Sequence, residues 1–405
     1  MTIKTIRRQE YSDKINKYLG KGLIIVITGQ RRVGKSCILK QLYEEKSVEA
    51  DSNVVYIDKE KREFDFISNY RELNAYLETK FDSGKHNYIL IDEVQDIKGF
   101  EHTIRSFHTE PETDVVITGS NAHILSGELS TIIGGRYKEI YVQPLSYTEF
   151  LLFHGLVDGD DALAKYIQFG GLPGLRKIGL DGFDAAEYVT DIYHTVLLKD
   201  VIMRNQIRNV VFLENLVTFL ADNNGKLISA NNISKFMKSQ GMNITSTIVI
   251  NYMAYLAQAF IIRKVNRYDI HGKRIFETND KYYFEDNGIR NAIVGGNREG
   301  DIEKVIENIV CQHLIRSGYR VFVGQLRSSE IDFVCVAADG RRAYVQAAYL
   351  IADESTRKRE FGNLKEIKDN YPKFVVSMTP LVTRSDCDGI VHLGLRTFLR
   401  SKFVI

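Results

Sequence analysis

The 405-residue chain contains no tryptophan, only five prolines and only four cysteines. The cysteines lie far apart, at Cys37, Cys311, Cys335 and Cys387, and no pair has the Cys-x-x-Cys spacing of a metal site. This pattern excludes a disulfide scaffold, disfavours a zinc site and predicts free thiols in a reducing compartment. Because no linker rich in serine, glycine and proline is present, domain boundaries have to be placed from changes in sequence pattern.

Long hydrophobic runs are also missing. The longest uncharged apolar stretches, such as 22–29 and 115–119, are far shorter than the roughly 18–20 residues that cross a bilayer. Residues 1–10 lack the apolar core of a signal peptide, so we expect a cytoplasmic protein with no membrane segment. The 54 Lys and Arg nearly balance the 52 Asp and Glu, and a net charge of +2 gives no overall attraction to nucleic acid. Binding to nucleic acid would therefore need a local patch of positive charge.

Short β-branched runs alternate with amphipathic helical stretches in the first third of the chain. The runs cover 23–28, 54–57, 88–91, 114–118 and 139–142. This alternation is typical of strand–helix units around a parallel sheet, whose strands are buried on both faces. We therefore predict an α/β domain over 1–145, followed by a helical connecting region over 146–222.

Two helices are predicted next, over 229–238 and 245–258, with Ser229 and Thr245 as their caps. One face of the second helix is apolar and includes Ile248, Tyr252, Tyr255, Leu256 and Ala259.

A hairpin is predicted after these helices, with strands over 260–268 and 274–278 and a turn at 271–273. Two helices followed by a hairpin are typical of a winged helix, which we assign to 223–298. Residues 299–405 return to an α/β pattern and form the last predicted domain.

The most specific motif follows the first predicted strand. Residues 29–36 read Gly-Gln-Arg-Arg-Val-Gly-Lys-Ser and open a helix, so they match GxxxxGK[ST] in letters and in context. Gly29 and Gly34 let the backbone curve around a phosphate, so that amide N–H groups face it. Lys35 would reach the β- and γ-phosphates, and Ser36 would bind Mg²⁺. A chance glycine turn is the alternative. The residues assigned to the nucleotide are Gly29, Gln30, Arg31, Arg32, Val33, Gly34, Lys35 and Ser36.

Two carboxylates end the apolar run 88–91. Asp92 would hold the Mg²⁺ shell, and Glu93 would orient or deprotonate the attacking water. This arrangement favours hydrolysis over phosphoryl transfer to a small molecule. The alternative is a strand that ends in solvated acids.

Small polar residues end the next run. Ser120 and Asn121 are candidates for contacting a γ-phosphate or the attacking water, and a capped turn is the alternative. Arg136, after two glycines, would neutralise charge in the transition state from its own or a neighbouring subunit. An ion-paired surface arginine is an equal alternative.

With these motifs the chain resembles AAA+ P-loop ATPases. More closely, it is similar to bacterial and archaeal ATP-binding proteins in which this module precedes a winged helix and a restriction-endonuclease-like domain. The resemblance rests on 29–36, 91–95, 117–121, 135–136, 144–146 and 170–173. It implies an α/β fold with a P-loop parallel sheet, ATP and Mg²⁺ as cofactors, and ATP hydrolysis. It also implies that the strand before Ser120 lies between the P-loop strand and the Asp92 strand.

The resemblance further implies a nuclease-like site in 299–405, where an acid on one strand faces (Asp/Glu)-x-Lys on the next. Asp332 supplies the first acid and Glu307 lies on a helix beside it, but Gln346 and Ala348 occupy the positions of the second carboxylate and the lysine. An amide is a weak Mg²⁺ ligand and alanine stabilises no charge, so we expect the domain to be inactive. A lysine elsewhere, such as Lys358 or Lys365, is the alternative.

Residues 224–282 contain nine Lys and Arg against three Asp and Glu. Such a local excess suits contact with phosphates, although the predicted helix 245–258 contains no basic residue and would read bases poorly. DNA and protein are therefore both candidate partners. The residues assigned to DNA are Lys235, Lys238, Arg263, Lys264, Lys273 and Arg274.

The sequence thus supports a Mg²⁺-dependent ATPase whose nucleotide state moves the winged helix and the nuclease-like domain. The second hypothesis is a slowly hydrolysing ATP-gated switch or scaffold that acts through protein partners, and the third is an ATP-dependent nuclease. Oligomerisation is compatible with each of them.

Overall fold

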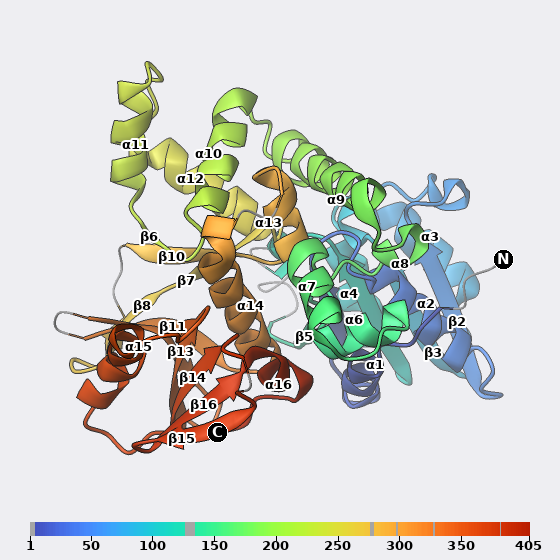
Figure 1. Ribbon diagram of the computed structural model, residues 1–405. Coiled ribbons are helices and arrows are strands. Elements are labelled where there is room, and N and C mark those ends of the chain that lie inside the picture. Colours follow the sequence, from blue (N-terminus) through green and yellow to red (C-terminus); the bar gives the residue numbers. More distant parts are fainter. Residues whose placement is uncertain (1–4, 126–133, 276–278, 297–298, 327–328, 381) are drawn as a thin grey trace. The chain divides into compact units, whose positions relative to one another are not determined.

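The computed structural model describes residues 5–125, 134–275, 279–296, 299–326, 329–380 and 382–405 (Figure 1). The chain forms two compact units. The first comprises Met1–Gln143 with Gln258–Phe260, and the second comprises Pro144–Ala257 with Ile261–Ile405.

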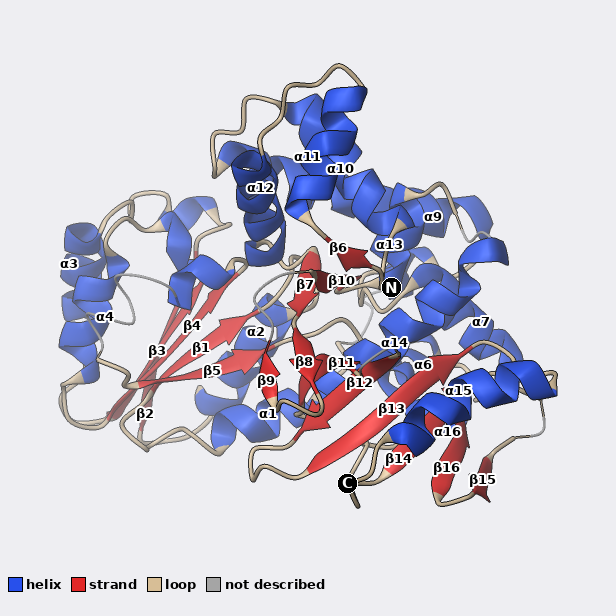
Figure 2. Ribbon diagram, turned by 90° about the vertical axis from the view of Figure 1, so that its left-hand side faces the viewer, coloured by secondary structure: helices blue, strands red, loops and turns tan. Residues whose placement is uncertain are grey.

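A five-stranded parallel sheet organises the first unit. Its strands are β1 (Ile24–Thr28), β2 (Ser52–Asp58), β3 (His86–Asp92), β4 (Thr113–Gly119) and β5 (Tyr137–Tyr141). They lie in the order β2-β3-β4-β1-β5, and every pairing is parallel (Figure 2). This confirms the predicted parallel sheet, and it confirms that the strand before Ser120 lies between the other two motif-bearing strands.

Helices cover both faces of this sheet. They are α1 (Gln9–Asn16), α2 (Lys35–Lys46), α3 (Tyr70–Lys80) and α4 (Phe100–His108), with short 3₁₀ turns η1 (Arg62–Phe64), η2 (Val94–Asp96) and η3 (Ala122–Leu125). Alternate strand residues point to opposite faces, so Ile24 and Val26 join the cluster under α3 and α4, whereas Ile25 and Ile27 are buried on the other face. Burial on both faces explains why the strands are continuously apolar.

The second unit begins with the predicted helical region. Its helices are α6 (Tyr147–His154), α7 (Asp160–Phe169), α8 (Leu175–Ile178), α9 (Gly182–Val196), the π-helical η4 (Leu197–Met203) and α10 (Val210–Asp222).

The glycine pair after α7 docks on the cap of a later helix. The Gly171 amide donates to Asp286 Oδ2 at 2.7 Å, and Asp286 caps α13 (Asn287–Ile293) by accepting from Ile289 N at 3.0 Å. A Cβ at Gly170 would lie 2.3 Å from Asp286 Oδ1. The Gly170-Gly171 pair therefore allows a close approach that side chains would prevent.

Helices α11 (Ala230–Ser239) and α12 (Ser246–Gln258) occupy the predicted positions. Thr245 caps α12 through its hydroxyl, which accepts from Ile248 N at 3.4 Å, but Ser229 makes no capping bond. Of the predicted apolar face, Leu256 and Ala259 are buried, whereas Ile248, Tyr252 and Tyr255 are half-buried. Val249 and Met253, which the prediction left out, are buried instead. Both faces of α12 are rich in apolar residues, and tertiary packing selects between them.

The predicted hairpin is divided between two sheets. Strand β7 (Ile262–Val265) pairs with β10 (Asp280–Phe284), which also pairs with β6 (Leu227–Ile228). Strands β8 (Arg267–Asp269) and β9 (Arg274–Ile275) pair with each other around the predicted turn, and β8 also pairs with β11 (Arg320–Gln325). The break at residue 266 was not visible in the sequence. Part of the predicted second strand, 276–278, lies outside the described residues.

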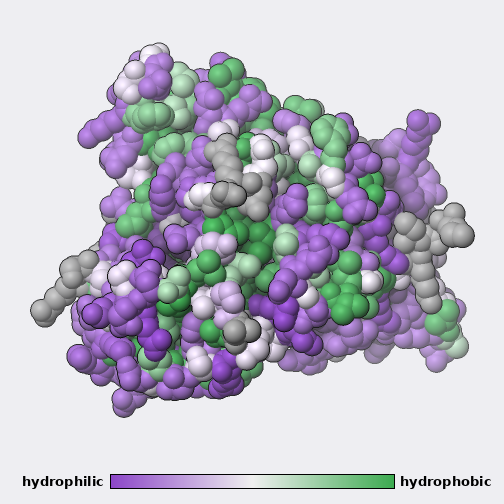
Figure 3. Space-filling model, viewed as in Figure 1, coloured by the Kyte–Doolittle hydropathy of each residue, from purple (hydrophilic) through white to green (hydrophobic). Residues whose placement is uncertain are grey.

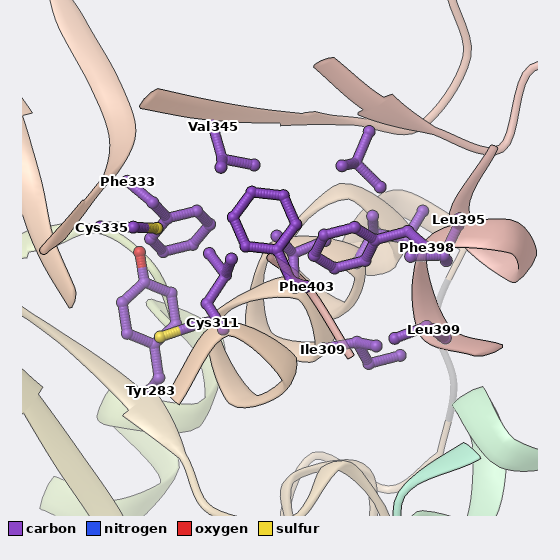
Figure 4. Packing of buried hydrophobic residues seen from close by; sticks show 14 of the residues in the cluster. Tyr283, Ile309, Cys311, Phe333, Cys335, Val345, Leu395, Phe398, Leu399 and Phe403 are labelled. Atoms are coloured by element: carbon purple, nitrogen blue, oxygen red, sulfur yellow. The ribbon is translucent and has the colours of Figure 1, made fainter. Parts of the chain in front are cut away.

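The C-terminal region completes an eight-stranded sheet in the order β15-β16-β14-β13-β12-β11-β8-β9. Its further elements are η5 (Glu299–Asp301), α14 (Ile302–Arg316), β12 (Glu330–Val336), β13 (Arg342–Ala348), α15 (Glu354–Glu366), β14 (Lys373–Ser377), β15 (Arg384–Cys387), β16 (Ile390–Gly394) and α16 (Leu395–Arg400). Helices α14 and α16 pack with Phe333, Val345 and Phe403 in one cluster, and α15 packs in a separate cluster (Figure 4). The sheet is therefore covered on both faces.

Hydrophilic residues cover most of the face shown in Figure 3, with smaller hydrophobic areas between them. Within the described ranges, no helix combines the length and the apolar character that spanning a membrane requires.

Candidate nucleotide-binding site

The carboxyl ends of three parallel strands bring the sequence motifs of the first unit to one edge of the sheet. Residues 29–36 follow β1, Asp92 and Glu93 end β3, and Ser120 and Asn121 follow β4. The predicted nucleotide residues and five of the six predicted catalytic or metal-binding residues therefore share this edge, and Arg136 does not.

The loop 29–36 has a backbone that only glycine permits at its ends. Gly29 has φ 144° and a Cβ there would lie 2.2 Å from the Val142 carbonyl oxygen, while Gly34 has φ 101° and precedes α2. Lys35 is buried, and its Nζ donates to the carbonyls of Gly29 at 2.8 Å and Gln30 at 3.0 Å. The lysine thus folds back over the loop whose phosphate it is predicted to bind.

Asp92 lies at the floor of this site. Thr118 donates its hydroxyl to Asp92 Oδ1, and the Ser36 hydroxyl also hydrogen-bonds the carboxylate. Burial raises the pKa of Asp92 to about 6, and these two hydrogen bonds oppose the rise. The two predicted Mg²⁺ ligands, Ser36 and Asp92, are therefore in direct contact.

Glu93 adopts a left-handed backbone, with φ 52°, that turns its side chain away from the strand. Its amide donates to Thr118 Oγ1 at 3.0 Å, and its carboxylate accepts from the side chains of Gln95 and Ser120. Burial alone would raise the pKa of Glu93, but the Lys35 ammonium and these hydrogen bonds lower it. The pKa values of the adjacent Asp92 and Glu93 are thus shifted in opposite directions, which is typical of functional sites.

Ser120 and Asn121 are both fully buried beside this pair. The preceding Gly119 is required by packing, because a Cβ there would lie 1.7 Å from Ile124 Cδ1 and 2.8 Å from Gln95 Oε1. The turn after β4 is therefore held tightly against the Glu93 partner Gln95.

Arg136 lies at the opposite end of the sheet. Its carbonyl accepts from Ile24 N at 3.0 Å, and Ile24 is the first residue of β1, whereas the nucleotide loop follows the last. The five residues of β1 span about 16 Å. The Arg136 side chain is exposed at this far end, so a role of Arg136 at the nucleotide stays a prediction.

Three residues that the sequence analysis did not single out contact these motifs. Arg8 is buried and donates to the carbonyls of Val33 and Gln143 at 2.9 Å each, while Thr118 and Gln95 hold the two carboxylates. Thr118 and Gln95 lie within the motifs, so the sequence could have predicted that they lie near the two carboxylates. Nothing in the sequence connects Arg8 with Val33, which is twenty-five residues away.

The six residues assigned to DNA differ in availability. Lys235, Lys238 and Lys273 are exposed. The other three form ion pairs: Arg263 with Glu285 at 2.7 Å, Lys264 with Asp280 at 2.8 Å, and Arg274 with Asp269 at 3.7 Å. These acids reduce the local positive charge on which the DNA prediction depends.

In the second unit, Asp332 and Gln346 lie on the neighbouring strands β12 and β13, as the nuclease-like interpretation requires. The Asp332 amide donates to Gln346 Oε1 at 3.3 Å, and Ala348 is buried. Neither Lys358, which is exposed, nor Lys365, which pairs with Asp388 at 2.5 Å, is the lysine that contacts Asp332. That lysine is Lys281, at 3.9 Å from Asp332 Oδ1.

Comparisons with known proteins identify two family matches and two relatives of this chain. The sequence profile of the AAA domain matches residues 21–151, and that of a domain of unknown function matches residues 160–300. A Haemophilus influenzae protein described as "Uncharacterized protein" is 34% identical over 398 residues, which cover 96% of this chain and 97% of that protein. An uncharacterized protein of Methanocaldococcus jannaschii is 25% identical over 362 residues, covering 85% and 79%.

Among solved structures, the Aeropyrum pernix ORC1 protein in complex with DNA has a TM-score of 0.33 at 11% identity, covering 72% of this chain and 93% of that chain. AMPPCP-bound DnaA from Aquifex aeolicus has a TM-score of 0.32 at 14% identity, covering 61% and 86%. Scores this low support no argument about function.

Proposed function

The chain belongs to the family of AAA-domain proteins that includes the Haemophilus influenzae relative, and from this premise we propose that it is a Mg²⁺-dependent ATPase. The observation that carries the proposal is the meeting of motifs from three strands. Ser36 hydrogen-bonds Asp92, Ser120 hydrogen-bonds Glu93, and the Lys35 ammonium lowers the pKa of Glu93.

The residues present fit a bound nucleotide and Mg²⁺. A side chain at Gly29 would collide with the Val142 carbonyl, and the buried Lys35 Nζ donates to the carbonyl oxygens of the loop. Both polar side-chain atoms of Gln30 are buried with no hydrogen-bond partner in the described structure. Such groups suit an anion cradled by the loop. Mg²⁺, when bound through Ser36 and Asp92, supplies a positive charge that stabilises the phosphates.

In the proposed mechanism, Lys35 leaves the loop carbonyls and donates to the phosphates. Glu93, ionised at neutral pH because its pKa is lowered, orients the attacking water and accepts its proton. Ser120 and Asn121 position Glu93 and contact the γ-phosphate or the water. Arg136 would act only on a nucleotide of a neighbouring subunit, so this role requires an oligomer.

Nucleotide turnover would reposition the region 223–298, which we propose to be a winged helix, and the region 299–405, which we propose to be an inactive restriction-endonuclease-like domain. DNA is a candidate partner through the exposed Lys235, Lys238 and Lys273. A cytoplasmic location and a protein partner remain part of the proposal.

A slowly hydrolysing ATP-gated switch is the second candidate, and one observation favours it. The Glu93 carboxylate already accepts hydrogen bonds from the Gln95 amide and from Ser120, and these bonds restrain its side chain. A base restrained in this way would hydrolyse ATP slowly while binding remains tight.

The deciding experiment measures ATP affinity and steady-state hydrolysis by the wild type, Lys35→Ala and Glu93→Gln, each with and without duplex DNA. Turnover that is lost in both variants, with affinity lost only in Lys35→Ala, supports the ATPase. Tight binding with negligible wild-type turnover supports the switch, and full activity in Lys35→Ala would refute both.

A further inference from the structure

A lysine ammonium group lies within an acidic cluster in the second unit. Lys281, on β10, is 4% exposed, and its Nζ lies 2.9 Å from Glu307 Oε1, 2.6 Å from Glu330 Oε1 and 3.9 Å from Asp332 Oδ1. Glu307 comes from α14, and the other two acids come from β12. We call Glu307, Glu330 and Asp332 the acidic cluster.

The surroundings of the acidic cluster hold two of its carboxylates, those of Glu307 and Asp332, in place. Tyr283 donates its hydroxyl to Glu307 Oε1 at 2.6 Å, and the Ala347 amide donates to Asp332 Oδ2 at 2.9 Å. Gly225, with φ 74°, leaves room for Glu307, because a Cβ there would lie 2.9 Å from Glu307 Oε2. The Tyr283 ring packs on Phe333 with centroids 5.7 Å apart, at one end of the cluster shown in Figure 4.

The positive charge of Lys281 is needed to keep the three carboxylates of the acidic cluster close together. Burial raises the pKa of Asp332 well above its usual range, and the nearby Glu307 raises it further, while Lys281 opposes the rise. Burial would lower the pKa of Lys281, but Glu307, Asp332 and Glu330 together raise it. The ammonium group therefore stays charged, and without it the partly buried carboxylates would repel one another uncompensated.

The same residues lack what a metal site needs. The side-chain oxygen of Gln346, Oε1, accepts a hydrogen bond from the backbone amide of Asp332, and the Ala348 side chain has no atom that could bind a metal ion. In the part of the chain that the structure describes, no three His, Cys, Asp or Glu side chains are arranged to hold a metal ion. The ammonium group instead lies among the carboxylates, where it supplies the positive charge itself.

We propose that Lys281 is the resident cation of the acidic cluster. Its ammonium group balances the three carboxylates and joins β10 to α14 and β12, so that this region folds without a metal ion. Because the buried lysine lies beside the partly buried Asp332 and the two glutamates, these acids do not serve metal-dependent hydrolysis of nucleic acid. The inference is independent of ATP turnover by the first unit.

The first test compares the full-length wild type, Lys281→Met and the control Lys264→Met. Lys264 also forms one ion pair, with Asp280 at 2.8 Å, but its side chain is 44% exposed. Melting temperature is measured in EDTA and in millimolar Mn²⁺. We expect Lys281→Met to melt several degrees below the wild type and below the control in EDTA, because it leaves buried acids unpaired. Mn²⁺ should raise the melting temperature of Lys281→Met more than that of the wild type, and adding Glu307→Gln should remove this extra shift.

A second variant covers the case in which Lys281→Met does not fold. Lys281→Met combined with Glu307→Gln, Glu330→Gln and Asp332→Asn carries no charge in the cluster, and we expect it to recover folding. A neutral variant that folds no better than Lys281→Met would overturn the proposal. So would Mn²⁺-dependent cleavage of DNA by the wild type that is lost in Lys281→Met, because the lysine would then be part of a nuclease site.

Discussion

Each unit of this chain buries one lysine beside carboxylates, and the two lysines differ in what they contact. Lys35 donates to the carbonyl oxygens of its own loop, whereas Lys281 forms ion pairs with Glu307 and Glu330. The Lys35 ammonium acts on the Glu93 carboxylate, whereas three carboxylates act on Lys281. An ammonium group surrounded by three carboxylates has less attraction left for an incoming anion. The comparison separates a lysine suited to binding from one suited to folding.

The largest effect is expected on stability, from the lysine of the acidic cluster. Lys281→Met should lower the free energy of unfolding of the second unit by about 3–5 kcal/mol, because removing one partner of a buried ion pair leaves uncompensated charge. ATP affinity should stay as in the wild type. Chemical denaturation measures the loss of stability, and nucleotide titration measures ATP affinity. An unchanged unfolding midpoint for Lys281→Met would contradict the role of Lys281 in folding.

Lys35→Ala should show the opposite pattern. Losing the charge-assisted bonds to the phosphates should weaken ATP binding or turnover by about 100-fold or more, with little loss of stability. The matched control is Lys40→Ala on the same helix, where the side chain is exposed. Calorimetric titration with ATP measures the difference, and equal affinities for the two variants would contradict the assignment of Lys35.

Glu93→Gln should reduce ATP turnover by about 100-fold and leave ATP affinity nearly unchanged, because the amide keeps the shape but cannot accept a proton. Gln95→Ala is the informative partner variant. If the Gln95 amide restrains Glu93, its removal should raise turnover. A fall in turnover for Gln95→Ala would show instead that Gln95 positions the base.

The smallest effect concerns pH. Since burial raises the pKa of Asp92 to about 6, the folded protein without nucleotide holds this proton more tightly than the unfolded chain does. Asp92 therefore stabilises the fold less as pH rises from about 4 to 6, and its carboxylate becomes available to Mg²⁺ over the same range. The Mg²⁺-dependent part of ATP affinity should rise about tenfold between pH 5 and pH 7. Asp92→Asn should remove that part of the dependence, which leaves only the titration of ATP itself.

The sequence predicted the first unit well, because the information there is local. Each strand is a short apolar run buried on both faces, and each motif lies within a few residues of a strand end, so parallel pairing alone brings Lys35, Asp92 and Ser120 together. The second unit was predicted less completely. Apolar residues lie on two faces of α12, so the sequence did not identify the buried one. The strands β7 and β8 were predicted as a single strand, because no residue between them marks the change from one sheet to the other.

The sequence by itself determined that this chain carries a GxxxxGK[ST] motif and an Asp-Glu pair, each after an apolar run, and it predicted a nuclease-like region without its second acid and lysine. Only the tertiary structure decided that Arg136 lies at the far end of its sheet and that Lys281, counted in the basic stretch 224–282, is buried among acids from elements that follow it in the chain. The physical reason is how far apart in the chain the interacting residues lie. A motif acts through neighbours in the chain, whereas the environment of a buried charge is set by residues that folding brings close, such as Glu307, 26 positions away.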